Sequence, residues 1–175
     1  MDVGWAPLGA DDAAVVRRWC RAFLVDHLRY WRDGAALPWD DDDILRHIDA
    51  HGLEDRDVRR LYEAASRWET NLVAVARDGG PVGAIWAETS RDPFLCREVG
   101  VIAWIYVEPH ARGRGVGGRL VGVARDWMRD RGLDVAMLHV TAANPAAVRM
   151  YEKAGFRVVD HRMMAPLGAP PASTL

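Results

Sequence analysis

The chain has 175 residues, of which 50% are apolar and 27% are charged, and its formal net charge is −2. This length and apolar content predict one domain that buries roughly 70% of the surface of its unfolded chain. The charge is so close to neutral that we expect neither nucleic acid nor an anionic membrane as a partner.

The first part of the chain is predicted to be mostly helical. Its expected elements are a short edge strand and three helical segments, at residues 3–7, 11–31, 41–51 and 55–68. Asp11 or Asp12 is placed to cap the first helix, and glycine and proline within residues 34–38 end it. Each segment gathers apolar side chains on one face, which is typical of helices that pack against a sheet.

Strands dominate the rest of the chain. The expected strands are at residues 71–76, 82–88, 98–107, 134–140, 156–160 and 162–166. A helix follows the third strand, and another begins at Pro145 behind its capping residue Asn144 and ends at Gly155. Residues 1–167 are therefore predicted to form a single domain, and residues 168–175 a disordered tail.

The most informative stretch is the glycine-rich turn after the strand at residues 98–107. It reads Arg112-Gly113-Arg114-Gly115-Val116-Gly117-Gly118 and opens a helix. Glycines at a helix N-terminus leave backbone N–H groups uncovered, and the positive end of the helix favours phosphate there. The turn lacks the Lys-Ser/Thr pair of a P-loop and lies too far behind the strand for a dinucleotide fingerprint. It predicts a pocket for a phosphorylated ligand.

Two motifs carry a family resemblance. The turn is similar to the acetyl-CoA pyrophosphate loop of the N-acetyltransferase superfamily abbreviated GNAT, with the pattern Arg-x-x-Gly-x-Gly beginning at Arg112. The stretch from Asn144 to Phe156 resembles the family's second motif, Asn-x-x-Ala-x-x-x-Tyr-x-x-x-Gly-Phe, at every position. The motifs follow each other in the family's order, separated by a helix and a strand. The sequence is therefore identified as a member of this superfamily.

The predicted elements, taken as β-α-α-β-β-β-α-β-α-β-β, resemble the family's α/β fold, a mixed central sheet that splays apart where the cofactor enters. The resemblance implies acetyl-CoA as co-substrate, without a metal. It implies acetyl transfer to a primary amine of a small, cationic molecule or of a peptide, by direct attack in a ternary complex. The alternatives on the same fold are a non-catalytic acyl-CoA-binding or regulatory module and a transferase for a longer acyl group.

The resemblance places the cofactor along the main chain around the turn. The strand end would hold the pantetheine arm as an added strand does, and the backbone N–H of Val107 would polarise the thioester carbonyl. The residues implied in cofactor binding are Tyr106, Val107, Arg112, Gly113, Arg114, Gly115, Val116, Gly117, Gly118, Asn144 and Tyr151. Helix capping is an equally good explanation of Asn144.

Tyr151 is the candidate general acid, because a phenol stays protonated at neutral pH and can donate to a departing thiolate. Packing in the core is the alternative for this side chain. The base that deprotonates the amine is sought among carboxylates near the central strand, in the order Glu98, Glu88 and Glu108. Each of the three is also typical of a solvated surface acid.

Residues 30–55 are where we expect the acceptor to be recognised, because members of the family differ most there. The candidate acceptor-binding residues are Tyr30, Trp31, Trp39, Asp41 and Asp42. Ring faces beside carboxylates suit a cation. Alternatively, the aspartates cap a helix and the tryptophans pack. His47 and His51 share a helix face, but the further ligands of a zinc enzyme are missing, so we predict no metal site.

Cellular setting and assembly follow from weaker signals. Cys20 and Cys96 are too few and too far apart for a disulfide scaffold, which favours a reducing, cytoplasmic location. The first residues lack the basic and apolar regions of a signal peptide, and no apolar run approaches the roughly 20 residues that span a bilayer. Because exposed edge strands often pair in the GNAT fold, the resemblance also implies a homodimer.

Overall fold

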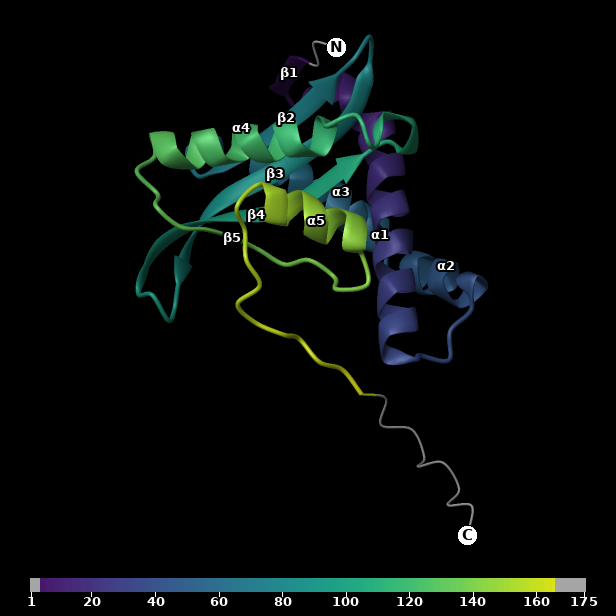
Figure 1. The fold of residues 1–175 in the computed structure, drawn as a ribbon. Coiled ribbons are helices and arrows are strands. Elements are labelled where there is room, and N and C mark those ends of the chain that lie inside the picture. Colours follow the sequence, from purple (N-terminus) through teal and green to yellow (C-terminus); the bar gives the residue numbers. More distant parts are fainter. Residues whose placement is uncertain (1–3, 166–175) are drawn as a thin grey trace.

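In the computed structural model, residues 4–165 are described, and they form a five-stranded sheet with helices on both faces (Figure 1). The strands are β1 Gly4–Pro7, β2 Asn71–Arg77, β3 Pro81–Asp92, β4 Arg97–Val107 and β5 Ala136–Leu138. The helices are α1 Ala13–Ala35, α2 Asp41–Ala50, α3 Leu53–Ser66, α4 Val116–Asp130 and α5 Pro145–Lys153, with 3-10 turns at Ala10–Asp12 and Pro109–Ala111. The expected mixed α/β fold is confirmed.

The strands lie in the sheet in their sequence order. β1 to β4 pair antiparallel with their neighbours, and β5 runs parallel to β4. A parallel pair needs a crossover, and α4 supplies it by returning the chain across one face of the sheet (Figure 1). Within residues 4–165, no helix combines the length and the apolar character needed to cross a bilayer.

The three helical segments predicted before the strand at residues 71–76 are all present, as α1, α2 and α3, although the order β-α-α-β counts only two helices there. α2 is capped by Asp40, whose carboxylate accepts from the backbone N–H of Asp43. The predicted and observed elements differ near the C-terminus. The hairpin expected at residues 156–166 is absent as far as residue 165. β5 has three residues instead of the seven predicted, so the sheet offers too short a ladder for further strands.

The end of the chain beyond residue 165 is not part of the described structure. The predicted domain boundary at residue 167 and the predicted tail at residues 168–175 lie outside the described residues. So does residue 166, the last residue of the expected hairpin.

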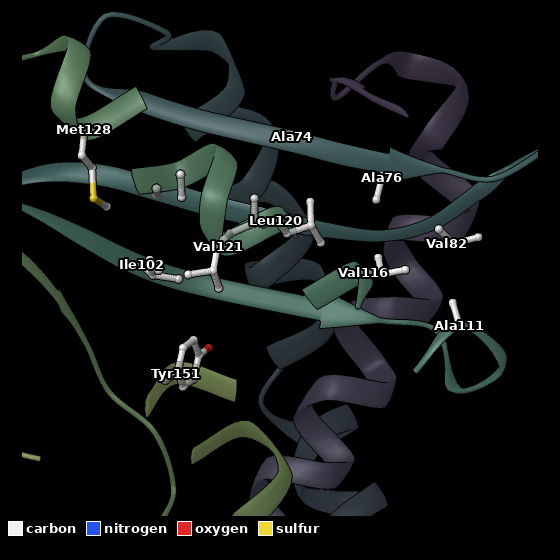
Figure 2. Packing of buried hydrophobic residues seen from close by; sticks show 13 residues of the cluster. Ala74, Ala76, Val82, Ile102, Ala111, Val116, Leu120, Val121, Met128 and Tyr151 are labelled. Atoms are coloured by element: carbon white, nitrogen blue, oxygen red, sulfur yellow. The ribbon is translucent and has the colours of Figure 1, made fainter. Parts of the chain in front are cut away.

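The two faces of the sheet carry separate cores. On one face, α4 and α5 pack through Val116, Leu120, Val121, Met128 and Tyr151 against side chains such as Ile102 of β4 (Figure 2). On the other face, α1 and α3 pack through Trp19, Cys20 and Leu61 against β2, β3 and β4. Burial of these apolar surfaces stabilises both layers at about 25 cal/mol per Å² removed from water.

One extra residue in β4 changes which side chains reach each core. Trp86 of β3 lies opposite Trp104, whereas Ala87 lies opposite Ile102, so Ala103 has no partner across the strands. This is a β-bulge, and it shifts the alternation of side chains by one. Ile102 consequently packs in the α4–α5 core and Trp104 in the α1–α3 core, although their even spacing in an unbroken strand would place them on the same face.

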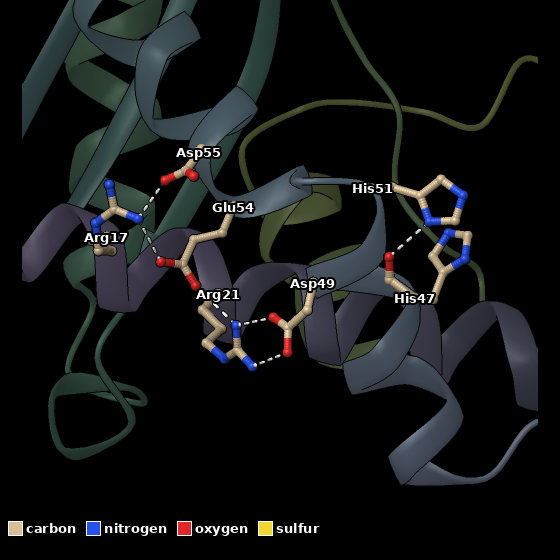
Figure 3. Close-up of polar contacts among 7 residues, drawn as sticks. All are labelled: Arg17, Arg21, His47, Asp49, His51, Glu54 and Asp55. Atoms are coloured by element: carbon tan, nitrogen blue, oxygen red, sulfur yellow. Dashed lines mark hydrogen bonds and ion pairs between the residues drawn. The ribbon is translucent and has the colours of Figure 1, made fainter.

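Ion pairs fix α1 to the start of α3 and to α2 (Figure 3). The Arg17 guanidinium lies 2.9 Å from the Glu54 carboxylate, and Arg21 lies 2.8 Å from Asp49 and 3.1 Å from Glu54. The hydrogen bond from Arg21 lowers the pKa of the Asp49 carboxyl. The pairs form a network on a partly exposed surface, which favours one orientation of the three helices more than it adds stability.

The tryptophans Trp86 and Trp104 offer a matched test of core hydrogen bonding. Both are buried, but only Trp86 donates its indole N–H, to the Asn71 side-chain oxygen at 2.9 Å. The Trp104 indole nitrogen is buried without a partner among the described residues. Trp86→Phe orphans the Asn71 oxygen, so we expect it to lower the free energy of unfolding by about 1–3 kcal/mol more than Trp104→Phe does. Urea denaturation measures both, and equal losses would contradict this account.

Candidate active site

The glycine-rich turn joins β4 to α4 in a conformation that requires glycine. Gly113 and Gly115 have φ angles of 74° and 83°, in the left-handed region that side chains disfavour. Gly115 is the N-cap of α4, and no side chain caps this helix end. Backbone N–H groups of the first turn are therefore open for an anion, at the positive end of a 15-residue helix. This geometry agrees with the predicted phosphate pocket.

Arg112 and Arg114 frame the turn and already have protein partners. The Arg112 Nε donates to the Val107 carbonyl at 2.9 Å, and its guanidinium lies over the Tyr106 ring. Arg114 lies 3.3 Å from the Asp78 carboxylate. Both side chains stay partly exposed, so they can turn toward a ligand only by exchanging these contacts. The backbone is the fixed part of the pocket.

The free edge of β4 begins where the bulge lies. β5 pairs with Gly100, Val101 and Ile102 of β4 and with no later residue of that strand. The last residues of β4, up to Val107, remain paired with β3 on their other side. Apart from the Val107 carbonyl, which accepts from Arg112, main-chain groups on this side of the half-strand can pair with an extended ligand that leads from the glycine-rich turn to the bulge.

The second motif forms α5, beside this edge. Pro145 begins the helix, and the Asn144 side chain accepts from the backbone N–H of Ala147 at 3.1 Å, so Asn144 is a helix cap as the alternative interpretation had it. Tyr151 is 6% exposed and packs edge-on against Phe156 with ring centres 5.9 Å apart. Burial raises the pKa of Tyr151 to about 12, so its hydroxyl keeps its proton at neutral pH.

The three candidate bases lie apart from one another. Glu98 is exposed near the tip of the β3–β4 hairpin, opposite Arg91, and Glu88 is half-buried opposite Val101. Glu108 accepts from the indole N–H of Trp19 at 2.6 Å. None of the three is among the wall residues of the two cavities described below. The choice of general base among these carboxylates stays a prediction.

A cavity of about 410 Å³ lies between α1, α2, α3 and the sheet. Its walls are Phe23, Leu24, His27, Leu28, Trp31, His47, Leu53, Arg56, Asp57, Arg60, Leu61, Trp86, Ala103 and Trp104. The bulge residue Ala103 belongs to the wall, so the cavity reaches the point where β4 parts from β5. It is of the size that small ligands occupy, with mostly apolar walls and a few polar groups.

The acceptor candidates from the sequence separate into two groups. Trp31 lines the cavity, whereas Tyr30, Trp39, Asp41 and Asp42 do not. Trp39 packs against the core of α1 and α2. Asp41 is exposed and binds two arginines, Arg29 at 2.6 Å and Arg32 at 2.8 Å. Asp40 and Asp43 form a capping box, so the acidic run is occupied largely by local contacts, as the capping alternative expected.

Sequence reasoning missed most of the cavity wall. Phe23, His27 and Trp31 recur every four residues, a spacing that was visible as part of the apolar stripe of α1. The wall residues from α3 and the bulge residue Ala103 had no comparable pattern in the sequence. Within residues 4–165, no group of three or more His, Cys, Asp or Glu side chains is placed to hold a metal ion.

A second cavity, of about 450 Å³, lies beside the end of β4 and is lined by four arginines of α1 and of the turn. Each arginine faces a carboxylate: Arg18 faces Glu108, Arg21 faces Asp49, Arg29 faces Asp41 and Arg112 faces Asp26. Its positive charge is therefore largely neutralised within the protein.

The sequence profile described as the acetyltransferase (GNAT) family matches residues 28–156, which include the turn, the free edge of β4 and α5. The chain belongs to this family.

Curated relatives named mycothiol acetyltransferase are similar to this chain over part of their own length. The one from Cellulomonas flavigena is 30% identical over 154 residues, which cover 80% of this chain and 44% of the relative. The one from Salinispora tropica is 32% identical over 140 residues, or 74% of this chain and 44% of the relative. The chain thus spans less than half the length of these relatives.

Solved structures confirm the GNAT fold at low sequence identity. A GCN5-related N-acetyltransferase from Ralstonia eutropha superposes with a TM-score of 0.65 at 22% identity, covering 96% of this chain and all of that one. Glucosamine-6-phosphate N-acetyltransferase from Arabidopsis thaliana gives a TM-score of 0.58 at 16% identity, covering 95% and 99%. At such identities the likeness concerns the fold.

Gly115 can be tested against a glycine of the same helix. Alanine at residue 115 has to adopt a left-handed φ, so we expect Gly115→Ala to cost about 1–2 kcal/mol of unfolding free energy. Gly122 lies in the interior of α4 with open space around its Cα, so Gly122→Ala should add about 0.5–1 kcal/mol. Chemical denaturation of both variants measures the two effects. A Gly115→Ala variant as stable as the parent protein would show that the turn relaxes without strain.

Proposed function

We propose that the protein transfers an acetyl group from acetyl-CoA to a primary amine of a small molecule. The observation that carries this proposal is that three features follow one another in space: the glycine-rich turn, the free edge of β4 and the cavity beside Ala103. The pyrophosphate would lie against the turn, the pantetheine arm along β4 and the thioester at the bulge. The acceptor would enter from the cavity on the α1–α3 side, so donor and acceptor would meet in one ternary complex.

Backbone groups would polarise the thioester. The N–H of Val107 and its neighbours on β4 are fixed by pairing with β3, and a fixed donor of this kind contributes about 10²–10³ in rate. The names of the mycothiol acetyltransferases support a small-molecule acceptor. A peptide amine is the second acceptor class to be assayed.

Tyr151 would act on the leaving group as a hydrogen-bond donor. Its pKa of about 12 lies well above the value near 8.5 that is typical of a thiol. Full proton transfer from the phenol to the thiolate would therefore be uphill, whereas a hydrogen bond from the phenol stabilises the negative sulfur without it. The proton that the thiolate finally takes would come from solvent or from another group.

The thermal melt with and without acetyl-CoA tests cofactor binding before the acceptor is known. Ligand at a hundredfold its Kd adds about 2.7 kcal/mol, and the midpoint should rise by roughly 5–10 °C. We expect Gly115→Glu to abolish this rise, because the carboxylate would face the pyrophosphate. Gly122→Glu, with open space further along α4, should retain it. An undiminished rise in Gly115→Glu would remove the cofactor from this turn.

Tyr151→Phe tests the leaving-group step. The change removes only the hydroxyl, so we expect kcat to fall at least about tenfold while the acetyl-CoA melt shift stays as in the parent protein. Release of CoA in the presence of an accepted amine measures kcat. Unchanged turnover would assign Tyr151 to packing in the α4–α5 core alone.

A further inference from the structure

Aromatic side chains from α1 and from the sheet line the cavity between α1, α3 and the sheet, and they meet where Phe23 and Trp104 lie with ring centres 5.7 Å apart. On α1, His27 stacks on Phe23 with ring centres 5.7 Å apart and lies 4.8 Å from the ring centre of Trp31. Trp86 and Trp104, paired across β3 and β4, contribute the sheet side of the wall. A ligand in this cavity is surrounded by aromatic side chains, which suits a flat apolar body.

The charged groups around this cavity have a surplus of positive charge. The single carboxylate of the wall, Asp57, already accepts from the Arg56 Nε at 2.9 Å. The Arg60 guanidinium lies 5.3 Å from the ring centre of Trp86 and makes no ion pair with the described residues. Arg162 covers the Trp31 ring from the chain's final segment, at 5.0 Å. Such surroundings attract an anionic group and repel a polycation.

His27 is the titratable group of α1 in this wall. Burial is the main cause that lowers the pKa of His27; the Arg162 guanidinium adds to the effect and Asp57 opposes it. The other charged or titratable groups facing the cavity come from α2 and α3 and are His47, Arg56, Asp57 and Arg60. The imidazole is therefore neutral at pH 7. Its contacts with Phe23 and Trp31 are ring contacts, which leave a nitrogen lone pair to accept a proton.

We infer that the cavity binds an amine with a flat apolar body and an anionic group held by Arg60, and that His27 accepts the proton this amine loses. The inference rests on the acetyl transfer proposed above. The amine nitrogen attacks the thioester carbon, a C–N bond forms, and the C–S bond breaks with its electron pair going to sulfur. One proton passes from nitrogen to the imidazole and the thiolate takes up one proton, so the products are an amide and the CoA thiol.

Matched acceptors test the chemical class. Tryptophan and tryptamine differ only in the carboxylate, and spermidine is a flexible polycation. With the full chain and acetyl-CoA, we expect kcat/KM for tryptophan to exceed that for tryptamine roughly tenfold, as a charge-assisted contact allows. Arg60→Gln should remove this preference. Arg59→Gln, which removes the same charge from the neighbouring residue outside the cavity, should keep it. A preference for spermidine would overturn the assigned class.

His27→Phe tests the proton acceptor, because the ring stack on α1 persists while both nitrogens are lost. We expect kcat to fall by about 10²–10⁴ at pH 7 with the acetyl-CoA melt shift unchanged. The parent protein should lose kcat as pH falls below the ordinary imidazole pKa of about 6.5, and the residual activity of the variant should lack this limb. His51→Phe, outside the cavity, should behave as the parent protein does.

The outcomes separate this inference from the proposed function. If the His27→Phe variant still acetylates amines, and its kcat still falls at low pH as in the parent protein, His27 is not the proton acceptor. The proposed acetyl transfer is unaffected by that result. A large fall of kcat in Glu88→Gln or Glu98→Gln, with no fall in His27→Phe, would likewise overturn the role of His27 and leave acetyl transfer in place. A melt shift with acetyl-CoA but no CoA release with any amine overturns both.

Discussion

The extra residue at Ala103 is the constraint on which the candidate site depends. Without it, β4 would alternate regularly, and the tryptophan at residue 104 would face α4 instead of the cavity. The pairing of β4 with β5 also stops at Ile102, directly before this residue. The extra residue thus lies where the edge of β4 becomes free of β5, and it turns Trp104 toward the cavity between the sheet and α1. A regular β4 would lack this orientation of Trp104.

The parts of the site that depend on local backbone chemistry were predictable from the sequence. Gly113 and Gly115 were expected at a turn that opens a helix, and their positive φ angles explain why glycine is needed there. Asn144 and Pro145 marked the start of α5 correctly, because a cap and a fixed φ act within one helical turn. The starts of β2 and β3 were each predicted to within one residue for the same reason. Each of these features is determined by neighbours in sequence.

The cavity was not predictable, because its walls come from segments far apart in the chain. Arg60 and Asp57 lie in a helix whose periodicity indicated only an apolar face. Ala103 gave no sign of a bulge in an otherwise continuous apolar strand. The acidic run at residues 40–43 is conspicuous in the sequence, but Asp41 binds Arg29 and Arg32. The strands expected at residues 156–160 and 162–166 are absent as far as residue 165 for a related reason, since they would have to pair beside β5, which has only three residues.

Glu108 connects the two halves of the site. It follows the last residue of β4, its backbone N–H donates to the Val82 carbonyl at 2.9 Å, and its carboxylate receives the indole N–H of Trp19, which is 1% exposed on α1. The helix that carries His27 is therefore tied to the segment that leads into the glycine-rich turn. A cofactor bound to that turn and an acceptor against α1 would share this connection, so the alignment of donor and acceptor would depend on a partly buried hydrogen bond as well as on the sheet.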